Sequence, residues 1–166
     1  RFSMGAFGGA GPMLACHLAK DLGLAEIIVP PAPGVLSAFG GLVADIRNDF
    51  IRTVMVDVNN KGLKSILVSV KTLEEEATSW LRDEQGFKGK SELLWSCDMR
   101  YRGQSFEIET IVKQSWLYDS SNEKIKAAFH KAHHQVYDHS DESAEVQIVN
   151  LRLVIVGTVP KPSLPM

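Results

Sequence analysis

The sequence predicts a mixed fold in which an α/β first part is followed by an α+β part built on an antiparallel sheet. Three observations lead to this fold class. Residues 2–30 alternate short apolar runs with one apolar helical segment, the order of a strand–helix–strand unit. Residues 60–86 repeat apolar side chains at three- and four-residue spacing, the period of a helix packed on one face. From residue 92 the period changes to two, which is typical of antiparallel strands with one solvated face.

The composition is that of a globular chain without a strongly charged surface. Of the 166 residues, 45% are hydrophobic and 23% are charged, and the formal net charge is −2. Nucleic acids and anionic membranes bind basic patches, so neither is an expected partner. The apolar runs are far shorter than the roughly 18 residues that a membrane span needs.

The two cysteines, Cys16 and Cys97, are too few for a disulfide framework or a zinc site. We expect two buried thiols in a reducing compartment, no metal site, and a cytoplasmic location. Because the sequence opens on Arg1 rather than Met, we also expect a piece of a longer chain.

Local signals define the elements of the first part. Pro12 suits the first turn of a helix, and Gly23 is a typical residue just after a helix ends. Gly40 and Gly41 lie inside a further helical segment and indicate close packing or a kink. The expected elements are a strand at 2–7, a helix at 12–23, a strand at 26–30, a helix within 31–46 entered after Pro33, and a strand at 49–58.

Periodicity defines the elements of the second part. They are a helix at 60–86, strands at 92–101 and 105–112 joined by a turn, a helix at about 121–137, and a strand at 146–157. The side chains expected to face the core are Leu93, Trp95, Cys97, Met99, Tyr101, Phe106, Ile108, Ile125, Ala128, Phe129, Ala132, Val136, Val149, Leu151, Leu153 and Ile155. The pattern is interrupted near residues 57–62, which suggests a boundary between regions 1–57 and 58–166.

The opening stretch RFSMGAFGGAGPMLACHLAK places four glycines just before the first helix. A dinucleotide-binding fold needs G-x-G-x-x-G and an acidic residue after the next strand, and both are missing. A Walker A loop needs Gly-Lys-Ser/Thr, which is also missing. Two interpretations stay open on spacing alone. Either the turn brings the free N–H groups of the helix to a nucleotide phosphate or ribose, or it lets a strand and a helix cross closely.

The chain resembles the C-terminal part of the hydantoinase A / 5-oxoprolinase family over nearly its whole length. The likeness rests on FGGAGPMLACHLAKDLGLAEIIVPPAPGVLSAFGGLVADIRNDFIRTV, MRYRGQSFEIE, FHKAHHQVYDH and VQIVNLRLVIVG. It implies an actin/Hsp70/acetate-kinase-type nucleotide-binding core, with residues 1–57 as the end of that core and 58–166 as a C-terminal module. In such cores a strand–Gly-Gly–helix element touches the nucleotide. The matching positions here are Gly8, Gly9, Ala10 and Gly11.

The resemblance also implies a reaction. The parent protein would use ATP and Mg²⁺ to phosphorylate the oxygen of a cyclic amide, after which water opens the ring and ADP and phosphate leave. A hydantoinase B-type partner subunit or domain is implied, and the isolated chain is expected to be inactive. Two alternatives stay open: an acetone-carboxylase-like subunit that activates a ketone by the same chemistry, and a non-catalytic scaffold module that binds a partner subunit.

One position departs from the family pattern. The family often has a histidine two residues after the proline of GGAGP, whereas this sequence has Leu14 there and His17 three residues later. The resemblance therefore implies that the family histidine is lost or replaced by His17. No catalytic residue is assigned from the sequence.

A second group of histidines lies in AAFHKAHHQVYDH. His130 and His134 are four residues apart and share a helix face, as two metal ligands can, but no third ligand is identifiable. The alternatives are surface or packing histidines, with His133 and His139 in the same segment. The family has a similar F-H-x-x-H-x-x-x-Y-G-H pattern, which implies a structural or site-lining role.

Two charged segments have a binding interpretation and a plain one. The charged residues of ADIRNDFIR are Asp45, Arg47, Asp49 and Arg52. They could line a cleft or the face that contacts a partner subunit, or they could form alternating ion pairs on the surface. In RYRGQ, Arg100 and Arg102 lie at the turn between two strands, where they either bind a carboxylate or a partner or remain solvated. Glu74, Glu75 and Glu76 predict a solvated helix face.

Overall fold

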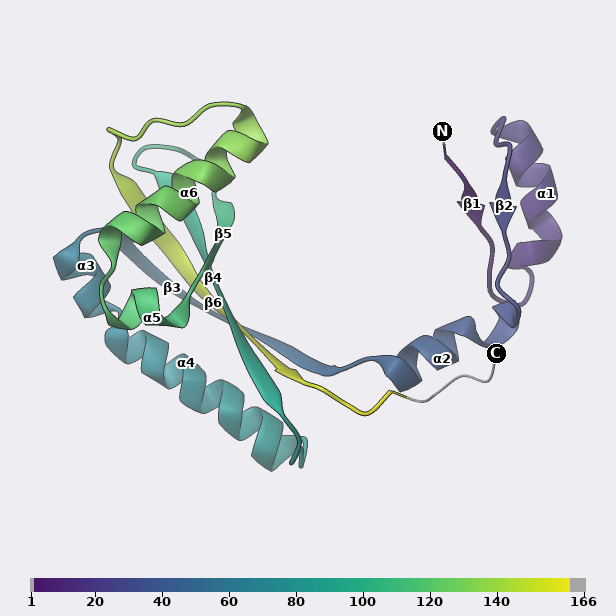
Figure 1. Ribbon diagram of the computed structural model, residues 1–166, viewed down its shortest axis with the longest axis horizontal. Helices are drawn as coiled ribbons and strands as arrows, with labels where there is room; N and C mark the ends of the chain where they lie inside the picture. The colour runs from purple at the N-terminus through teal and green to yellow at the C-terminus, as the bar shows by residue number, and fades with distance from the viewer. Residues whose placement is uncertain (1, 162–166) are drawn as a thin grey trace. The chain divides into compact units, whose positions relative to one another are not determined.

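The computed structural model describes residues 2–161, which divide into two compact units (Figure 1). The first comprises residues 2–44 with 159–161, and the second comprises residues 45–158. The division therefore falls at Ala44, earlier than the pattern interruption near residues 57–62. The reason is that the strand ending at Asp57 pairs with the last strand of the chain, which places it in the second unit.

The first unit is the expected strand–helix–strand arrangement, with shorter strands than the apolar runs predicted. Its two strands are paired in parallel, Met4 with Ile27. Pro12 lies in the first turn of the connecting helix, and the chain leaves that helix through Gly23 at a φ of +65°. The elements are β1 (Met4–Gly5), α1 (Gly11–Asp21), β2 (Ile27–Ile28), the 3₁₀ turn η1 (Pro33–Val35) and α2 (Leu36–Val43).

The first unit has almost no core of its own. The buried hydrophobic side chains of its described residues are all alanines: Ala6, Ala15 and Ala19. Its large apolar side chains are exposed instead: Phe2, Phe7, Met13, Leu14, Leu18, Leu22, Ile28, Val29, Val35 and Leu42.

The second unit is built on a four-stranded antiparallel sheet in the order β3-β6-β4-β5. The sheet confirms the antiparallel pairing expected for residues 92–112. The return strand begins at Ile108 rather than at residue 105, and Phe106 is 77% exposed in the loop before it. The strands are β3 (Ile46–Asp57), β4 (Ser91–Tyr101), β5 (Ile108–Val112) and β6 (Val146–Gly157).

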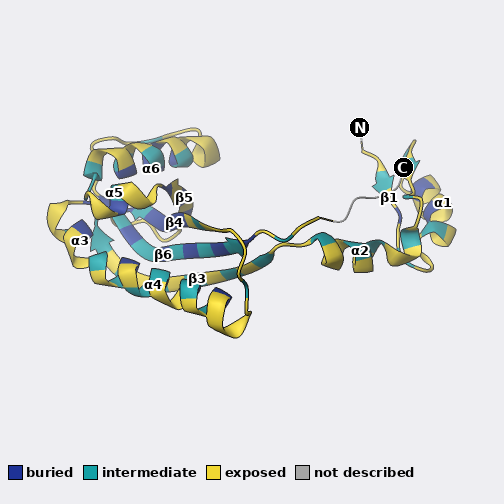
Figure 2. Ribbon diagram, turned by 60° about the horizontal axis from the view of Figure 1, so that its bottom comes forward, coloured by how far each residue is buried: buried dark blue, intermediate teal, exposed yellow. Residues whose placement is uncertain are grey.

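The helices of the second unit cover one face of this sheet. Helix α4 packs against β3 and β6, and α6 packs against β5 (Figures 1 and 2). The segment predicted as one helix over 60–86 changes geometry at Ile66 and again at Trp80, where a π turn begins. The helical elements are α3 (Asn60–Ser65), α4 (Leu67–Ser79), the π turn η2 (Trp80–Glu84), α5 (Gln114–Tyr118) and α6 (Asn122–Tyr137).

Most of the expected core positions are buried, but Phe106 and Val136 are exposed, and Leu93, Ala128, Ala132 and Val149 are only partly buried. Val136 is 60% exposed, because the inward face of α6 runs through His130 and His133 instead. Val149 is only partly buried because it is the extra residue of a β-bulge: Asp98 pairs with Asn150 but Met99 pairs with Ile148. The bulge shifts the alternation, so that Val146 and Ile148 share the buried face with Leu151, Leu153 and Ile155.

The face of the sheet away from the helices is polar at its centre. Asp98 is only 7% exposed there, because its carboxylate accepts hydrogen bonds from Arg152 Nε at 2.7 Å and Asn150 Nδ2 at 2.8 Å. Ser96 donates to Glu109 at 2.7 Å beside them. The expectation of one solvated face is thus modified: Asp98 and Ser96 are buried by their polar neighbours.

Candidate functional site

The glycine-rich turn connects β1 to α1 and is held at one point. Gly8 has a φ of +86°, a left-handed conformation that favours glycine, and its N–H donates to the carbonyl of Pro33 at 2.8 Å. The turn is thereby tied to the segment that leads into α2. Gly9, Ala10 and Gly11 are exposed.

The space around the turn does not explain its glycines. A Cβ atom built on Gly9 or Gly11 would meet no atom of the described chain within 4 Å, and neither glycine has a positive φ. The same holds for Gly40 and Gly41, where α2 continues without a break. Close crossing of strand and helix within the described residues therefore accounts for none of these four positions.

The helix that follows the turn begins without a side-chain cap. Its N-cap residue is Ala10, which has no side-chain oxygen to accept from the first-turn N–H groups. Pro12 has no N–H, and Lys20 lies in the last turn. A helix N-terminus carries partial positive charge and free N–H donors, features that suit a negatively charged group.

At the position where the family often has histidine, this chain has an aliphatic side chain with no titratable or nucleophilic group. Leu14 is 53% exposed on α1, and His17 is exposed on the same helix. Cys16, expected to be buried, is also exposed. Cys97 is buried as expected, and burial followed by the nearby Asp98 carboxylate raises the pKa of its thiol to about 12.

The histidines of α6 divide into buried and exposed members. His130 is 9% exposed and its Nδ1 lies 2.8 Å from Tyr101 Oη, and His133 is 3% exposed. His134 is largely exposed, with Nε2 3.8 Å from Asp138. Within residues 2–161 no three His, Cys, Asp or Glu side chains are grouped as metal ligands. The packing interpretation holds for His130 and His133 and the surface interpretation for His134.

Arg100, near the end of β4, and Arg102, in the β4–β5 turn, bind carboxylates of their own chain. Arg100 contacts Glu107 at 3.1 Å, and Arg102 contacts Asp57 and, at 3.1 Å, Glu145. These ion pairs join the turn to β3 and to the segment before β6. The two arginines are therefore engaged internally.

The ADIRNDFIR charges of β3 form ion pairs on the surface. Arg47 contacts Asp49 at 3.2 Å within the strand, and Arg52 contacts Glu76 of α4 at 2.7 Å. The surface ion-pair interpretation holds for these residues.

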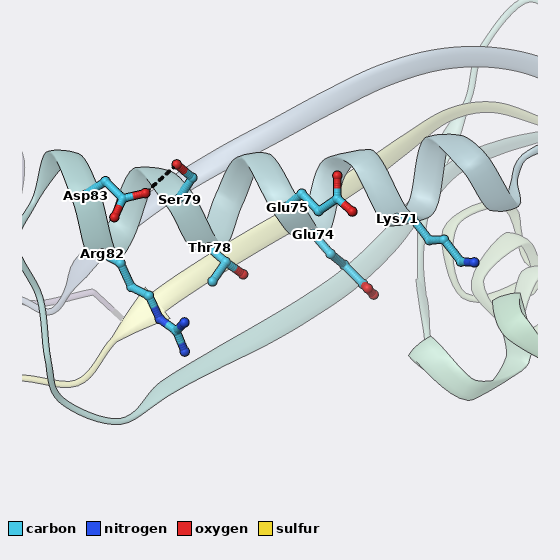
Figure 3. Close-up of a pocket in the computed structure, with 7 residues that line it drawn as sticks. All are labelled: Lys71, Glu74, Glu75, Thr78, Ser79, Arg82 and Asp83. Atoms are coloured by element: carbon cyan, nitrogen blue, oxygen red, sulfur yellow. Dashed lines mark hydrogen bonds between the residues drawn. The ribbon is translucent and has the colours of Figure 1, made fainter.

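A hollow along the outer side of α4 offers no catalytic arrangement (Figure 3). Its lining comes from successive turns of one helical segment and includes Lys71, Glu75 and Arg82. The Glu74 carboxylate accepts hydrogen bonds from Tyr118 Oη at 2.6 Å and from Gln114 Nε2 at 2.5 Å. The hydrogen bond to Glu74 raises the pKa of the Tyr118 phenol to about 12. Ser79 donates to Asp83 at 2.7 Å.

Sequence reasoning missed the contacts that connect Tyr101 and Gln104 to the histidines. Gln104 Nε2 lies 3.2 Å from His133 Nε2, and the rings of Tyr101 and His133 are 4.7 Å apart. The signal available was that His130 and His133 are three residues apart on the helix whose inward face also carries Phe129. The pairing with the β4–β5 loop is a tertiary contact that periodicity does not show.

Comparison with known proteins gives one consistent result. Residues 1–50 match the model of the Hydantoinase/oxoprolinase family. An uncharacterized protein of Methanocaldococcus jannaschii is 34% identical over 98% of this chain and 22% of its own length. The caprolactamase subunit alpha of Pseudomonas jessenii is 28% identical over 99% of the chain and 24% of its own length.

Two solved structures share the fold. The ATP-dependent caprolactamase from Pseudomonas jessenii superimposes with a TM-score of 0.72 at 26% identity, over 99% of this chain and 24% of that one. The nucleotide-free structure of acetone carboxylase gives a TM-score of 0.75 at 22% identity, over 99% of this chain and 25% of that one. This chain thus spans about a quarter of the length of these proteins. Residues 1–50 thus match the hydantoinase/oxoprolinase family, and nearly the whole chain is similar to these relatives.

Proposed function

We propose that the chain is the C-terminal region of an ATP-dependent hydrolase that opens a cyclic amide. In this proposal the first unit supplies part of the nucleotide-binding site, and the second unit forms the C-terminal module. The nucleotide-binding part, expected from the sequence over residues 1–57, is assigned to residues up to Ala44, because residues 45–57 pack in the second unit. In this proposal the chain alone is inactive, because its first unit supplies only part of the nucleotide-binding site.

The observation that carries the proposal is the open glycine turn before an uncapped helix. Gly9 and Gly11 have free space where a side chain would lie, and α1 has first-turn N–H groups without side-chain acceptors. Both features suit close approach of a phosphate-bearing ligand to the backbone. Gly8, Gly9, Ala10 and Gly11 are the residues that would contact ATP.

Mg²⁺ belongs to the same proposal, but it is assigned to other parts of the parent protein. Within residues 2–161 no three acidic, histidine or cysteine side chains are grouped to hold a metal ion. The glycine turn itself presents backbone N–H groups, which bind anions rather than cations.

A hydantoinase B-type partner subunit or domain is also proposed. The ten exposed large apolar side chains of the first unit support a covered surface in the assembled protein. The names of two relatives, a caprolactamase subunit alpha and an acetone carboxylase beta subunit, describe parts of larger enzymes. A cytoplasmic location completes the proposal and is supported by two cysteines that form no disulfide. No helix of residues 2–161 is both long and apolar enough to cross a bilayer.

Two other functions are compatible with this fold. The first is that of an acetone-carboxylase-like subunit, and it is supported only by likeness of fold to acetone carboxylase, at 22% identity. A scaffold module would be supported by an apolar outer face on the sheet, whereas the centre of that face is the polar group around Asp98. The open glycine turn favours nucleotide binding over the scaffold.

The test is ADP release by the full-length protein, with and without its partner subunit. The substrates offered are 5-oxoproline, hydantoin, N-methylhydantoin, caprolactam, and acetone with bicarbonate. Stimulation by one cyclic amide supports the hydrolase, and stimulation by acetone with bicarbonate supports the carboxylase. ATP binding without stimulation leaves the substrate outside this set. Absence of ATP binding supports the scaffold and contradicts the proposal.

A further inference from the structure

Strand β4 has a stretch of edge that no other described strand covers. On one side β4 pairs with β6 from Ser91 to Tyr101 (Figure 1). On its other side the pairing with β5 covers only residues 95–99, because β5 ends at Val112 and the chain then turns into α5. Residues 91–94 of β4 therefore lie at an open edge of the sheet.

The hydrogen-bond pattern shows which backbone groups point to this edge. The N–H of Thr158 donates to the carbonyl of Lys90 at 3.1 Å, so these two residues form a hydrogen-bonded pair of the antiparallel ladder. Such pairs alternate with non-bonded pairs along two strands, so the backbone groups of residues 92 and 94 also point to β6. Those of Ser91 and Leu93 point away from β6, to the open edge.

These outward groups have no partner within residues 2–161. No backbone or side-chain atom in that range is hydrogen-bonded to the N–H or the C=O of Ser91 or Leu93. Ser91 is exposed, so the edge is accessible. Free donors and acceptors at the repeat of a strand are the groups that another extended backbone satisfies.

The opposite edge of the sheet is protected in a way that this edge is not. That edge is β3, which pairs with β6, and the N–H of Asp49 donates there to Asn48 Oδ1 at 3.0 Å. An ion pair between Arg47 and Asp49 lies beside this bond. Charged side chains and a self-capped N–H discourage the addition of a strand. Among the described residues, nothing comparable caps Ser91 or Leu93.

An apolar hollow lies beside the open edge, on the face of the sheet that carries Asp98. It has a volume of about 460 Å³, and its apolar lining includes Leu94, Ile111 and Val154. Leu94 is 44% exposed and Ile111 is 81% exposed. A strand added along β4 would present every second side chain on this face, where apolar ones can cover the hollow.

The charges around the hollow favour an acidic occupant. Lys113 directly follows β5 and lines the hollow, and Lys90 directly precedes β4. Neither lysine forms an ion pair within the described part of the chain. Glu109, an acid of the lining, already accepts a hydrogen bond from Ser96 at 2.7 Å. Acidic side chains on the added strand would therefore find two free lysines.

A second copy of this chain fits the edge less well. The register in which Ser91 of each copy bonds Leu93 of the other sets the two Glu92 side chains directly opposite each other. Like charges in directly opposed positions of two strands are destabilising.

We propose that the open edge of β4 at Ser91–Leu93, together with the hollow beside it, is the docking site for an acidic, extended segment of the partner subunit, which adds to the sheet as a strand in line with β5. This inference rests on the part of the proposed function that gives the parent protein a partner subunit. It assigns that subunit a contact on the second unit.

The first test is hydrogen exchange of the 166-residue chain and of the full-length parent protein, alone and with the hydantoinase B-type subunit. In the 166-residue chain, the amides of Ser91 and Leu93 are expected to exchange fast and those of Glu92 and Leu94 slowly. The fast amides should become protected in the parent only when the subunit is present. Protection in the parent alone would assign the edge to the parent's own chain, and protection that rises with the concentration of the 166-residue chain would assign it to a second copy. Either result overturns the proposal.

Substitutions test whether the backbone edge and the charge carry the docking. Ser91→Pro removes an outward donor at the first residue of β4, where a strand tolerates proline, whereas Ser91→Ala keeps that donor. Lys113→Glu reverses a charge of the hollow, and Lys124→Glu makes the same change at an exposed position of α6. The affinity of the parent for the subunit is expected to fall about tenfold or more in Ser91→Pro and Lys113→Glu, and to stay unchanged in the two controls.

ATP binding by the same samples separates this inference from the proposed function. A parent that binds ATP and the subunit, but leaves Ser91 and Leu93 unprotected, contradicts the docking site alone. A parent that binds ATP but forms no complex with the subunit contradicts both the docking site and the partner subunit. Equal affinities of Ser91→Pro and Ser91→Ala for the subunit would also contradict a strand added at this edge.

Discussion

The two units differ most in how they bury apolar side chains. The second unit closes a continuous core between its sheet and helices, with side chains such as Phe129 and Leu153 at 0% exposure. The first unit buries three alanines and exposes ten large apolar side chains. Ordering a residue costs about 1–2 kcal/mol of backbone entropy, and each large buried side chain returns about 1.5–3 kcal/mol. Three alanines do not offset that cost over about 40 residues, so the first unit depends on a surface beyond its own.

The two units therefore differ in whether they can fold without the rest of the protein. A region that closes its own core can act as a self-standing module, whereas a parallel strand pair with exposed apolar helices is typical of a segment cut from a larger parallel sheet. The glycine turn lies in the unit that is incomplete by itself. In the proposed function, other parts of the parent protein complete the nucleotide site at this turn.

The largest effect is expected when the two units are separated. Residues 45–158 alone should fold cooperatively, because their core is internal. Residues 1–44 alone should be unstructured. Circular dichroism and amide NMR dispersion of the two peptides check this expectation. A dispersed spectrum from residues 1–44 alone would remove the basis of the comparison.

A pair of core and surface truncations should sharpen the contrast. Phe129→Ala removes a fully buried ring that packs edge-on against Tyr101, and we expect a loss of about 3–5 kcal/mol in the free energy of unfolding. Leu14→Ala, on the exposed side of α1, should change it by less than about 0.5 kcal/mol. Urea denaturation of the 166-residue chain measures both values. Comparable losses would mean that Leu14 packs in solution.

A smaller effect is expected from the polar centre of the sheet. Asp98→Ala leaves Arg152 and Asn150 without their acceptor, and the expected loss is about 1–3 kcal/mol. The matched variant Asp49→Ala removes an exposed ion pair with Arg47 and should cost less than about 0.5 kcal/mol. The same urea experiment gives both values, and equal losses would argue against burial of Asp98.

The smallest perturbation is chemical labelling of the two thiols. Cys16 is exposed and should react with a thiol reagent in the native chain. Cys97 should react only after denaturation, because burial raises the pKa of its thiol to about 12 and blocks access. Absorbance at native and denaturing conditions counts the reactive thiols. Two reactive thiols in the native chain would show that the core of the second unit opens.

Periodicity predicted the elements of both units well, because strands and helices bury one face and the sequence records that face. The errors arose where a tertiary contact overrides the pattern. Val149 was misplaced by a bulge that depends on the register with β4, and Phe106 lies in a loop held by Gln104 rather than in a strand. Val136 was predicted to face the core, but His133 faces it instead. A histidine can face inward when both of its ring nitrogens have hydrogen-bond partners.

The candidate site was predictable only in part. The glycine turn and the helix after it were readable from Gly8 to Pro12, because glycine, proline and helix starts leave local signals. Only the structure shows that no atom of the described chain crowds Gly9 or Gly11. The contacts of Tyr101 with His130 and of Gln104 with His133 join residues 29 positions apart in sequence, so no local pattern predicts them.

The most direct test of the central claim is ATP binding by the full-length parent protein with a substituted glycine turn. Gly9→Val fills the space that the proposal reserves for the nucleotide, and Gly41→Val makes the same change at an open position of α2. The account predicts at least a tenfold weaker affinity for Gly9→Val, about 1.4 kcal/mol, and an unchanged affinity for Gly41→Val. Equal affinity of Gly9→Val and the unsubstituted protein would contradict a nucleotide site at the turn.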